Sequence, residues 1–263
     1  MKLSGAHVLV TGASRGIGAA VADGAAGRGA TVTLVARSEG PLRERAARSN
    51  GHALPCDLGN AAERDGLVER AESSAGRPVD VLVNCAGLDA VAGLLEVTAE
   101  QMRSLYEVNL LAPAELVRQV LPGMVARGRG HLVTVSSGFS TVTAPGLVPY
   151  ASSKAGLSHF HAGVGLELKG TGVGLTLVEP GPVRTGMWED IEVHGLAAAA
   201  LERWVRLQLT RIVTPDEVAE KVLDGVEQGR SHVVPSRRMS PVLAFTWIPR
   251  RVGDLALTGV RRR

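Results

Sequence analysis

Short apolar runs rich in β-branched residues alternate with longer helical stretches along most of the sequence, and this alternation restricts the folds open to the chain. The runs predict strands at residues 6–11, 31–36, 53–56, 79–84, 131–136, 174–178 and 232–234. The intervening stretches predict helices at residues 17–27, 42–49, 61–74, 113–126, 150–168 and 215–227. Such alternation favours a parallel sheet with right-handed crossovers and helices on both faces. We therefore expect a doubly wound α/β fold of about seven strands, with its ligand site at the strand carboxyl ends.

Composition favours one domain followed by a tail. The chain has 263 residues, of which 45% are apolar, so it can bury one large core. We expect a domain at residues 1–235 and an extension at residues 236–263. The sequence has no run of the roughly 18 apolar residues that a membrane span needs, and no signal-peptide pattern. It therefore predicts a cytoplasmic protein.

Cysteine, histidine and charge patterns weigh against several kinds of site. Cys56 and Cys85 are the only cysteines and lie far apart, so we expect two buried thiols rather than a disulfide or a zinc site. His159 and His161 are two apart in a predicted helix and point to different faces. The net charge of +3 arises from the eight arginines from Arg230 onward, and the preceding body is net negative. We therefore predict no metal and no nucleic-acid partner.

A glycine-rich segment, TGASRGIG, leads from the first predicted strand into the first predicted helix. Gly12 permits a tight turn, Gly16 lets the backbone approach a pyrophosphate, and Gly18 allows the helix to pack closely on the strand. The spacing differs from the commonest dinucleotide fingerprint, and a purely structural turn is the alternative. The place between strand and helix favours a dinucleotide site, with Ser14 and Ile17 as further contacts.

The end of the second predicted strand bears on the choice of dinucleotide. An NAD site places an acid about 20 residues after the glycine loop, to hold the ribose hydroxyls. Here that place is occupied by Ala36 and Arg37. Arg37, together with Arg15 of the loop, can pair with a 2′-phosphate, which a carboxylate would repel. These residues favour NADP(H) over NAD(H), although two solvated arginines are the alternative.

The turns after the third and fourth predicted strands add candidate nucleotide contacts. Asp57, followed by Leu58, can accept a hydrogen bond from the adenine amino group. Asn84, Ala86 and Gly87 bring the backbone close to the ribose. Turns after strands favour these residue types in any case, so each residue alone is weak evidence.

Tyr150 and Lys154 lie one helical turn apart in the segment PYASSKAG, although the chain has only two tyrosines and four lysines. A phenol has an ordinary pKa near 10, and a cation on the same helix face favours the phenolate. We therefore expect a lowered pKa for Tyr150 and a role as general acid or base. Ser137, at the end of the fifth predicted strand, can hydrogen-bond the same substrate oxygen. The alternative is that Tyr150 caps a helix and Lys154 is solvated.

Six segments in order resemble the short-chain dehydrogenase/reductase family. They are TGASRGIG at 11–18, NCAG at 84–87, EVNL with Asn109, VSS ending at Ser137, YASSK at 150–154 and EPGPVRT at 179–185, within residues 5–234. The resemblance implies a Rossmann-like fold and an NADP(H)-dependent oxidoreductase that interconverts ketones and secondary alcohols. It implies that Lys154 also holds the nicotinamide ribose and that Asn109 supports a water in a proton relay. It further implies a homodimer or homotetramer. Cys85 departs mildly from the family pattern.

The segment after the sixth predicted strand looks like the part of the family that closes over the nicotinamide. The resemblance assigns cofactor contacts to Pro180, Gly181, Val183 and Thr185. A substrate lid is expected at about residues 185–210. Candidate substrate contacts are Gly138, Met187, Trp188 and Trp204. The apolar helix of the lid fits a core or subunit contact equally well.

The tail and the reaction class each leave alternatives open. Pro241 and Pro249 bracket a short apolar run with arginines on both sides. We expect the tail to pack on the body or at a subunit interface, and the alternative is weak contact with a membrane surface.

For the whole chain we expect a carbonyl reductase. The alternatives are a dehydratase or epimerase on the same fold, and a non-catalytic NADP-binding sensor.

Overall fold

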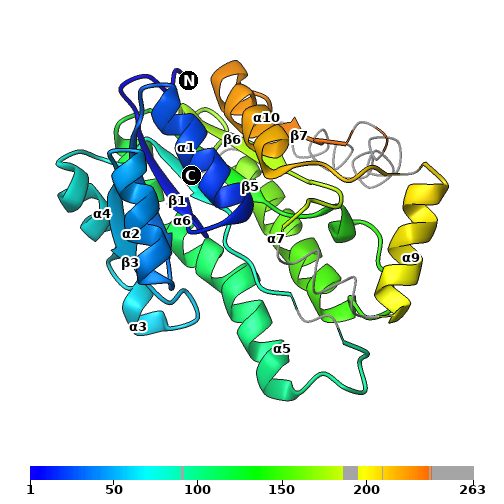
Figure 1. Ribbon diagram of the computed structural model, residues 1–263. Coiled ribbons are helices and arrows are strands. Elements are labelled where there is room, and N and C mark those ends of the chain that lie inside the picture. Colours follow the sequence, from blue (N-terminus) through cyan, green and yellow to red (C-terminus); the bar gives the residue numbers. More distant parts are fainter. Residues whose placement is uncertain (90–91, 186–194, 209, 237, 239–263) are drawn as a thin grey trace.

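The computed structural model describes residues 1–89, 92–185, 195–208, 210–236 and 238, and its centre is a seven-stranded parallel sheet (Figure 1). The strands are β1 (His7–Thr11), β2 (Thr31–Ala36), β3 (His52–Pro55), β4 (Val81–Asn84), β5 (Gly130–Val135), β6 (Val173–Val178) and β7 (His232–Val233). Their order in the sheet is β3-β2-β1-β4-β5-β6-β7. The structure thus confirms the doubly wound α/β fold, and each strand lies within two residues of its predicted bounds.

The helices account for most of the remaining described residues. They are α1 (Gly16–Gly27), α2 (Glu39–Arg48), α3 (Ala61–Arg64), α4 (Leu67–Ala75), α5 (Ala99–Tyr106), α6 (Ala112–Ala126), α7 (Val148–Glu167), α9 (Gly195–Arg206) and α10 (Pro215–Gln228). A π-helical turn, η1 (Glu107–Leu111), joins α5 to α6, and a 3₁₀ turn, η2 (Gly138–Ser140), follows β5.

Two helical segments differ from the prediction. The predicted helix at 61–74 is divided into α3 and α4, because Gly66 adopts a left-handed conformation with φ +62°. The pair α5 and η1 was not predicted. Thr98 caps α5 in a capping box with Gln101, a pattern that the sequence does contain. Among the described residues of α5 only Leu105 is buried, so its apolar periodicity is weak.

Each face of the sheet has its own apolar core, because successive strand residues point to opposite faces. Val8 and Val10 of β1 pack in the core shared with α1, α2 and α10. Leu9 packs in the opposite core, which it shares with α4, α6 and α7. Figure 1 shows these two layers of helices on either side of the sheet. This arrangement leaves the carboxyl ends of β1 and β4, where the chain changes direction across the sheet, open for a ligand.

Among the described residues, no helix combines the length and the apolar character required to cross a bilayer. Nearly all of the predicted extension at 236–263 lies outside the described residues. Its packing and its membrane contact therefore stay predictions. The same holds for assembly into a dimer or tetramer.

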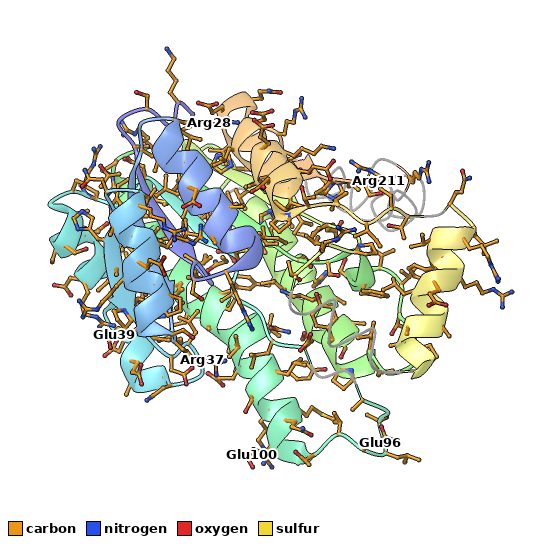
Figure 2. The ribbon with its side chains drawn as sticks, viewed as in Figure 1. Arg28, Arg37, Glu39, Glu96, Glu100 and Arg211 are labelled. Atoms are coloured by element: carbon orange, nitrogen blue, oxygen red, sulfur yellow. The ribbon has the colours of Figure 1, made fainter. Side chains whose placement is uncertain are left out.

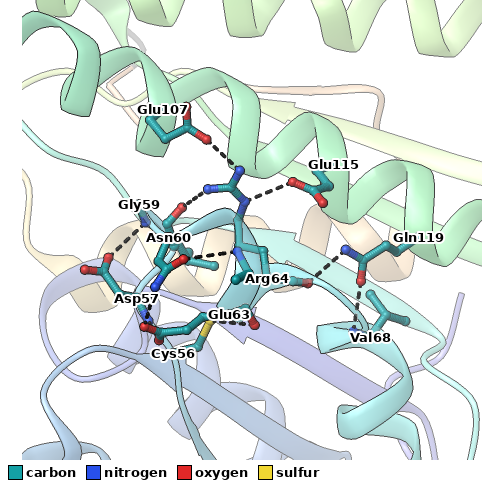
Figure 3. Close-up of polar contacts among 12 residues, drawn as sticks. Cys56, Asp57, Gly59, Asn60, Glu63, Arg64, Val68, Glu107, Glu115 and Gln119 are labelled. Atoms are coloured by element: carbon teal, nitrogen blue, oxygen red, sulfur yellow. Dashed lines mark hydrogen bonds and ion pairs between the residues drawn. The ribbon is translucent and has the colours of Figure 1, made fainter.

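A buried arginine joins the turn after β3 to the helical segment before α6 (Figure 3). The side chain of Arg64 is 3% exposed and donates to the carbonyl of Leu58 at 2.5 Å. It also donates to Glu107 at 2.5 Å and to Glu115 at 3.0 Å. Within the turn, Asp57 Oδ1 accepts from the backbone N–H of Gly59 at 2.9 Å. Arg64 therefore fixes the Leu58 backbone relative to η1, the turn that carries Asn109.

We expect Arg64→Met to lower the free energy of unfolding by about 3 kcal/mol, because it leaves the Leu58 carbonyl and two partly buried carboxylates without their cation. Urea unfolding followed by circular dichroism measures the change. The control is Arg43→Met, which breaks the exposed ion pair between Arg43 and Glu39. That pair is worth less than about 1 kcal/mol. Equal losses in the two variants would show that Arg64 is not a structural anchor.

Candidate active site

A cleft of about 720 Å³ opens at the carboxyl edge of the sheet. Its volume lies within the range of small-molecule sites in proteins. Every residue predicted to contact a cofactor lines this cleft except Asn84. The Asn84 side chain is buried beneath it, where its amide nitrogen donates to the carbonyl of Pro113 at 3.4 Å. The structure therefore brings together segments that are separated by up to about 170 residues in sequence, from Gly12 to Thr185.

The glycine loop has the backbone geometry that its sequence predicts. Gly12 adopts φ +67°, and a Cβ atom there would lie 2.8 Å from Cα of Ala86. A Cβ atom on Gly18 would lie 2.5 Å from the carbonyl oxygen of Gly12. The first glycine thus allows the turn to meet the end of β4, and the last lets α1 pack against the loop. Gly16 has φ +61° and borders Thr185, so backbone rather than side chain faces the cleft here.

The amino end of α1 has the properties of an anion site. Arg15 is its N-cap residue, and no side chain caps the helix. The first N–H groups of such a helix are ready donors for a phosphate. The glycine loop leaves room for a dinucleotide to approach these donors, so the site fits that group.

Two arginines border the same part of the cleft. Arg15 and Arg37 are exposed, and within the described residues neither forms an ion pair. Glu39, the acid nearest to Arg37 in sequence, instead pairs with Arg43. Figure 2 shows Arg37 and Glu39 near the start of α2. The two guanidinium groups leave this edge cationic and suited to a phosphate.

The predicted residues Ser137, Tyr150 and Lys154 meet in the cleft. Tyr150 and Lys154 lie on α7 and are only 8% and 4% exposed. Lys154 Nζ is 6.0 Å from the centre of the Tyr150 ring and donates to the carbonyl of Val135 at 3.2 Å. Ser137, directly after β5, shares a side-chain hydrogen bond with Tyr150. Its hydroxyl also accepts from the N–H of Phe139 at 3.1 Å.

The sequence predicts a lowered pKa for Tyr150, and this prediction is wrong. Burial raises the pKa of Tyr150 to about 12, and the hydrogen bond with Ser137 offsets only part of this rise. Burial also lowers the pKa of Lys154 to about 8. Removal from water is the largest cause of both shifts, because both groups are deeply buried. At neutral pH the phenol therefore carries its proton, which is the form that a proton donor requires.

Asn109 lies behind the cleft rather than on its wall. It is fully buried in η1, where its amide nitrogen donates to the carbonyl of Leu88 at 2.9 Å and to Ser153 Oγ at 3.0 Å. Its Oδ1 accepts from the N–H of Leu88 at 2.8 Å. A Cβ atom on Gly87 would lie 3.4 Å from both Asn109 Oδ1 and Lys154 Nζ. Asn109 therefore supports the wall beside Lys154, and its proposed role with water stays a prediction.

An aromatic wall that the sequence did not predict borders Tyr150. Phe139 stacks on Trp204 with ring centres 5.6 Å apart, and its ring meets the Tyr150 ring edge-on at 6.5 Å. Phe139 lines the cleft, whereas Trp204 lies behind it on α9. Phe139 is one of only three phenylalanines and lies two residues after Ser137, which is the signal that could have indicated it.

The other predicted substrate contacts have different outcomes. Gly138 is buried and does not line the cleft, and its N–H donates to the carbonyl of Pro180 at 2.8 Å. This bond joins η2 to the bend after β6. Met187 and Trp188 lie outside the described residues.

Residues 6–194 match the family model of the short chain dehydrogenases. The chain belongs to the short-chain dehydrogenase family. It is 33% identical to the ketoacyl reductase HetN of Nostoc sp. over 274 aligned positions, which cover 99% of this chain and 88% of that protein. It also resembles a solved short-chain dehydrogenase from Sphingobium yanoikuyae in complex with NADPH. That likeness has a TM-score of 0.80 and 28% identity, and covers 98% of this chain and 97% of the other.

A metagenomic short-chain oxidoreductase in complex with NADP is another structural relative. Its TM-score is 0.72 and its identity 30%, over 89% of this chain and 98% of the other. The family expected from the six sequence segments is therefore confirmed.

We expect Gly18→Ala to weaken NADPH binding at least tenfold, because the new methyl group collides with the Gly12 carbonyl. A tenfold loss corresponds to about 1.4 kcal/mol. Gly27→Ala in the same helix is the control, since a Cβ atom there meets nothing within 4 Å. Fluorescence titration with NADPH measures both variants. Unchanged binding in Gly18→Ala would contradict the assignment of the loop.

Proposed function

We propose that this short-chain dehydrogenase is an NADP(H)-dependent carbonyl reductase, which reduces a ketone to a secondary alcohol or catalyses the reverse reaction. The observation that carries the proposal is that Ser137, Tyr150 and Lys154 meet in one dinucleotide-sized cleft, with Lys154 Nζ 6.0 Å from the centre of the Tyr150 ring. A protein that only binds a nucleotide has no need for a buried proton donor at that place. The family and the similarity to a ketoacyl reductase support the same reaction class.

The chemistry follows from what these three side chains can donate. The substrate carbonyl oxygen accepts hydrogen bonds from the phenol of Tyr150 and the hydroxyl of Ser137. The reduced dinucleotide, when bound, supplies the hydride that the carbonyl carbon receives. As charge develops on the oxygen, Ser137 stabilises it and Tyr150 transfers its proton to it. The carbon has then gained a hydride and the oxygen a proton, so the product is the alcohol.

Lys154 and Asn109 restore the proton donor after the transfer. The ammonium group of Lys154 lies near the Tyr150 ring and compensates the phenolate that the reaction leaves. Its pKa of about 8 leaves it mostly protonated at neutral pH and also able to pass a proton on. Asn109, which like Lys154 lies next to Gly87, is the residue that we assign to hold a relay water.

The two arginines at the edge of the cleft favour binding of NADP(H) over NAD(H). Arg15 and Arg37 hold the 2′-phosphate, and NAD(H), which lacks this group, binds less well. Asp57 and Leu58 border the adenine, while Val183 and Thr185 border the nicotinamide. The solved relatives that hold NADPH and NADP support this assignment.

The aromatic wall supports a substrate with an apolar group next to its carbonyl. Phe139 stands between Tyr150 and the apolar cluster of Ala144, Leu147, Ala197 and Leu201. A substituent that extends from the reacting carbon along this wall removes apolar surface from water. The HetN relative is named as a ketoacyl reductase, so an acyl chain is one group that fits this description.

We expect Tyr150→Phe to lower the rate of ketone-dependent NADPH oxidation by about 10²–10⁴-fold, the usual contribution of a general acid. NADPH binding is retained, because the ring remains in place. Absorbance of the reduced nicotinamide measures the rate across a panel of apolar ketones. The control is Tyr106→Phe, which removes the only other phenol, one that bonds Ser152 at 2.6 Å. Comparable losses in both variants, or full activity in Tyr150→Phe, would rule out the assigned role.

We expect Arg37→Asp to weaken NADPH binding by about 10–100-fold, because a hydrogen bond to a charged group is worth about 1.5–3 kcal/mol. NADH binding is expected to remain the same or to improve, since NADH has no 2′-phosphate. Titrations with NADPH and NADH give the ratio of the two dissociation constants. Arg48→Asp is the control with the same charge change, because Arg48 does not line the cleft and pairs with Glu44. An equal loss for NADH would show that Arg37 does not read the phosphate.

A further inference from the structure

Glu179, the residue before Pro180, has a carboxylate buried behind the catalytic residues. The residue is 1% exposed, and its backbone N–H donates to the carbonyl of Val233 at 3.0 Å. Its Oε1 accepts from Ser140 Oγ at 2.5 Å and from Ser158 Oγ at 3.2 Å. Its Oε2 lies 2.8 Å from Nε2 of His232. One buried carboxylate thus contacts three polar side chains.

The partners of Glu179 belong to the elements that carry the catalytic groups. Ser140 ends η2, three residues after Ser137, and Ser158 lies on α7 one turn after Lys154. Ser158 Oγ also lies 2.7 Å from Ser136 Oγ, so Ser136 can donate to Ser158 while Ser158 donates to Glu179. The hydrogen bonds therefore run from the bend after β6 to both η2 and α7.

The carboxylate is held in its charged form. Burial by itself would raise the pKa of Glu179, but the hydrogen bonds with His232, Ser140 and Ser158 lower it below its usual value. A buried charge is retained only where fixed donors surround it. An ionised carboxylate accepts hydrogen bonds at both oxygens and donates none, so it can hold several donors at once.

Glu179 has no part in the chemistry proposed above. It does not line the cleft, so it cannot contact the substrate or the nucleotide. Its effect on the reaction must pass through the groups that it holds. Ser140 and Ser158 share one of its oxygens, so this oxygen fixes η2 against α7.

We propose that Glu179 is a positioning residue that sets the distance between Ser137 and Tyr150 by holding Ser140 of η2 and Ser158 of α7 on one carboxylate oxygen. The proposal rests on the carbonyl-reductase function proposed above. A hydrogen-bonding pair that acts on one substrate oxygen needs tight geometry, and small displacements cost large factors in rate. Loss of the link should therefore lower kcat and leave nucleotide binding unchanged.

The test uses two variants, Ser140→Ala and Glu179→Gln. Ser140→Ala removes the hydrogen bond between η2 and Glu179 and keeps the Glu179 carboxylate. We expect Ser140→Ala to lower kcat about tenfold, or about 1.4 kcal/mol. KM for the ketone and Kd for NADPH are expected to stay within about twofold. Ser140→Thr retains the hydroxyl and should restore most of kcat. The control is Ser74→Ala, whose hydroxyl donates to the carbonyl of Ala71 far from the cleft.

A double-mutant cycle with Ser137→Ala separates positioning from plain stabilisation. If Glu179 acts through Ser137, Ser140→Ala causes no further loss of kcat once Ser137 is alanine, so the two effects are not additive. The proposal would be overturned if Ser140→Ala lowered kcat by the same factor with and without Ser137→Ala. It would also be overturned if the loss of kcat only followed a fall in melting temperature. Should Glu179→Gln fail to fold, the Ser140 cycle still decides.

The two proposals fail in different ways. A wild-type protein that oxidises NADPH with none of the ketones overturns the carbonyl-reductase function and, with it, the role of Glu179. An active wild type with additive Ser137 and Ser140 effects overturns the role of Glu179 alone.

Discussion

Burial of Tyr150 and Lys154 favours the uncharged form of both groups, so it raises the pKa of the phenol and lowers the pKa of the ammonium group. The rest of the site accommodates this constraint. Removal from water stabilises the neutral phenol and destabilises the ammonium group. A helix that brings such groups into the interior also brings its own polar residues, and these need partners. Ser153 bonds to Asn109 at 3.0 Å, and Ser158 bonds to Ser136 and Glu179. The polar face of α7 is therefore stable because neighbouring elements supply fixed acceptors and donors.

The two halves of the cleft are held together by different kinds of interaction. On the nucleotide side, backbones pack closely at Gly12 and Ala86, and the strands present apolar cores on both faces. On the catalytic side, hydrogen bonds around Glu179 join the ends of β5 and β6 to α7. The first half leaves no room for a side chain at Gly12 or Gly18, whereas the second tolerates few unpaired polar atoms. Arg64 links the first half to η1, which carries Asn109 of the second.

Local signals in the sequence predicted the elements whose geometry is local. The strands follow runs of β-branched residues, and the glycine loop follows from φ values that only glycine adopts readily. The pair Tyr150 and Lys154 stood out because both residue types are rare in this chain. By contrast, Phe139 and Glu179 gain their importance from partners far along the chain, such as Trp204 and His232. The direction of the pKa of Tyr150 was missed because spacing along a helix does not show how deeply a residue is buried.

The raised pKa of Tyr150 also bears on the direction of the reaction. Reduction of a carbonyl takes a proton from the phenol, and oxidation of an alcohol returns one to the phenolate. A phenol with a pKa of about 12 holds its proton at neutral pH, which is the form that the proposed reduction uses. Oxidation needs the phenolate, whose formation becomes more favourable as the pH rises or as positive charge approaches the ring. The nearest fixed positive charge on the same helix is Lys154, whose own pKa of about 8 makes this help fade in alkaline solution. In the carbonyl reductase proposed above, burial of the pair therefore keeps the phenol in the protonated form that reduction uses near neutral pH.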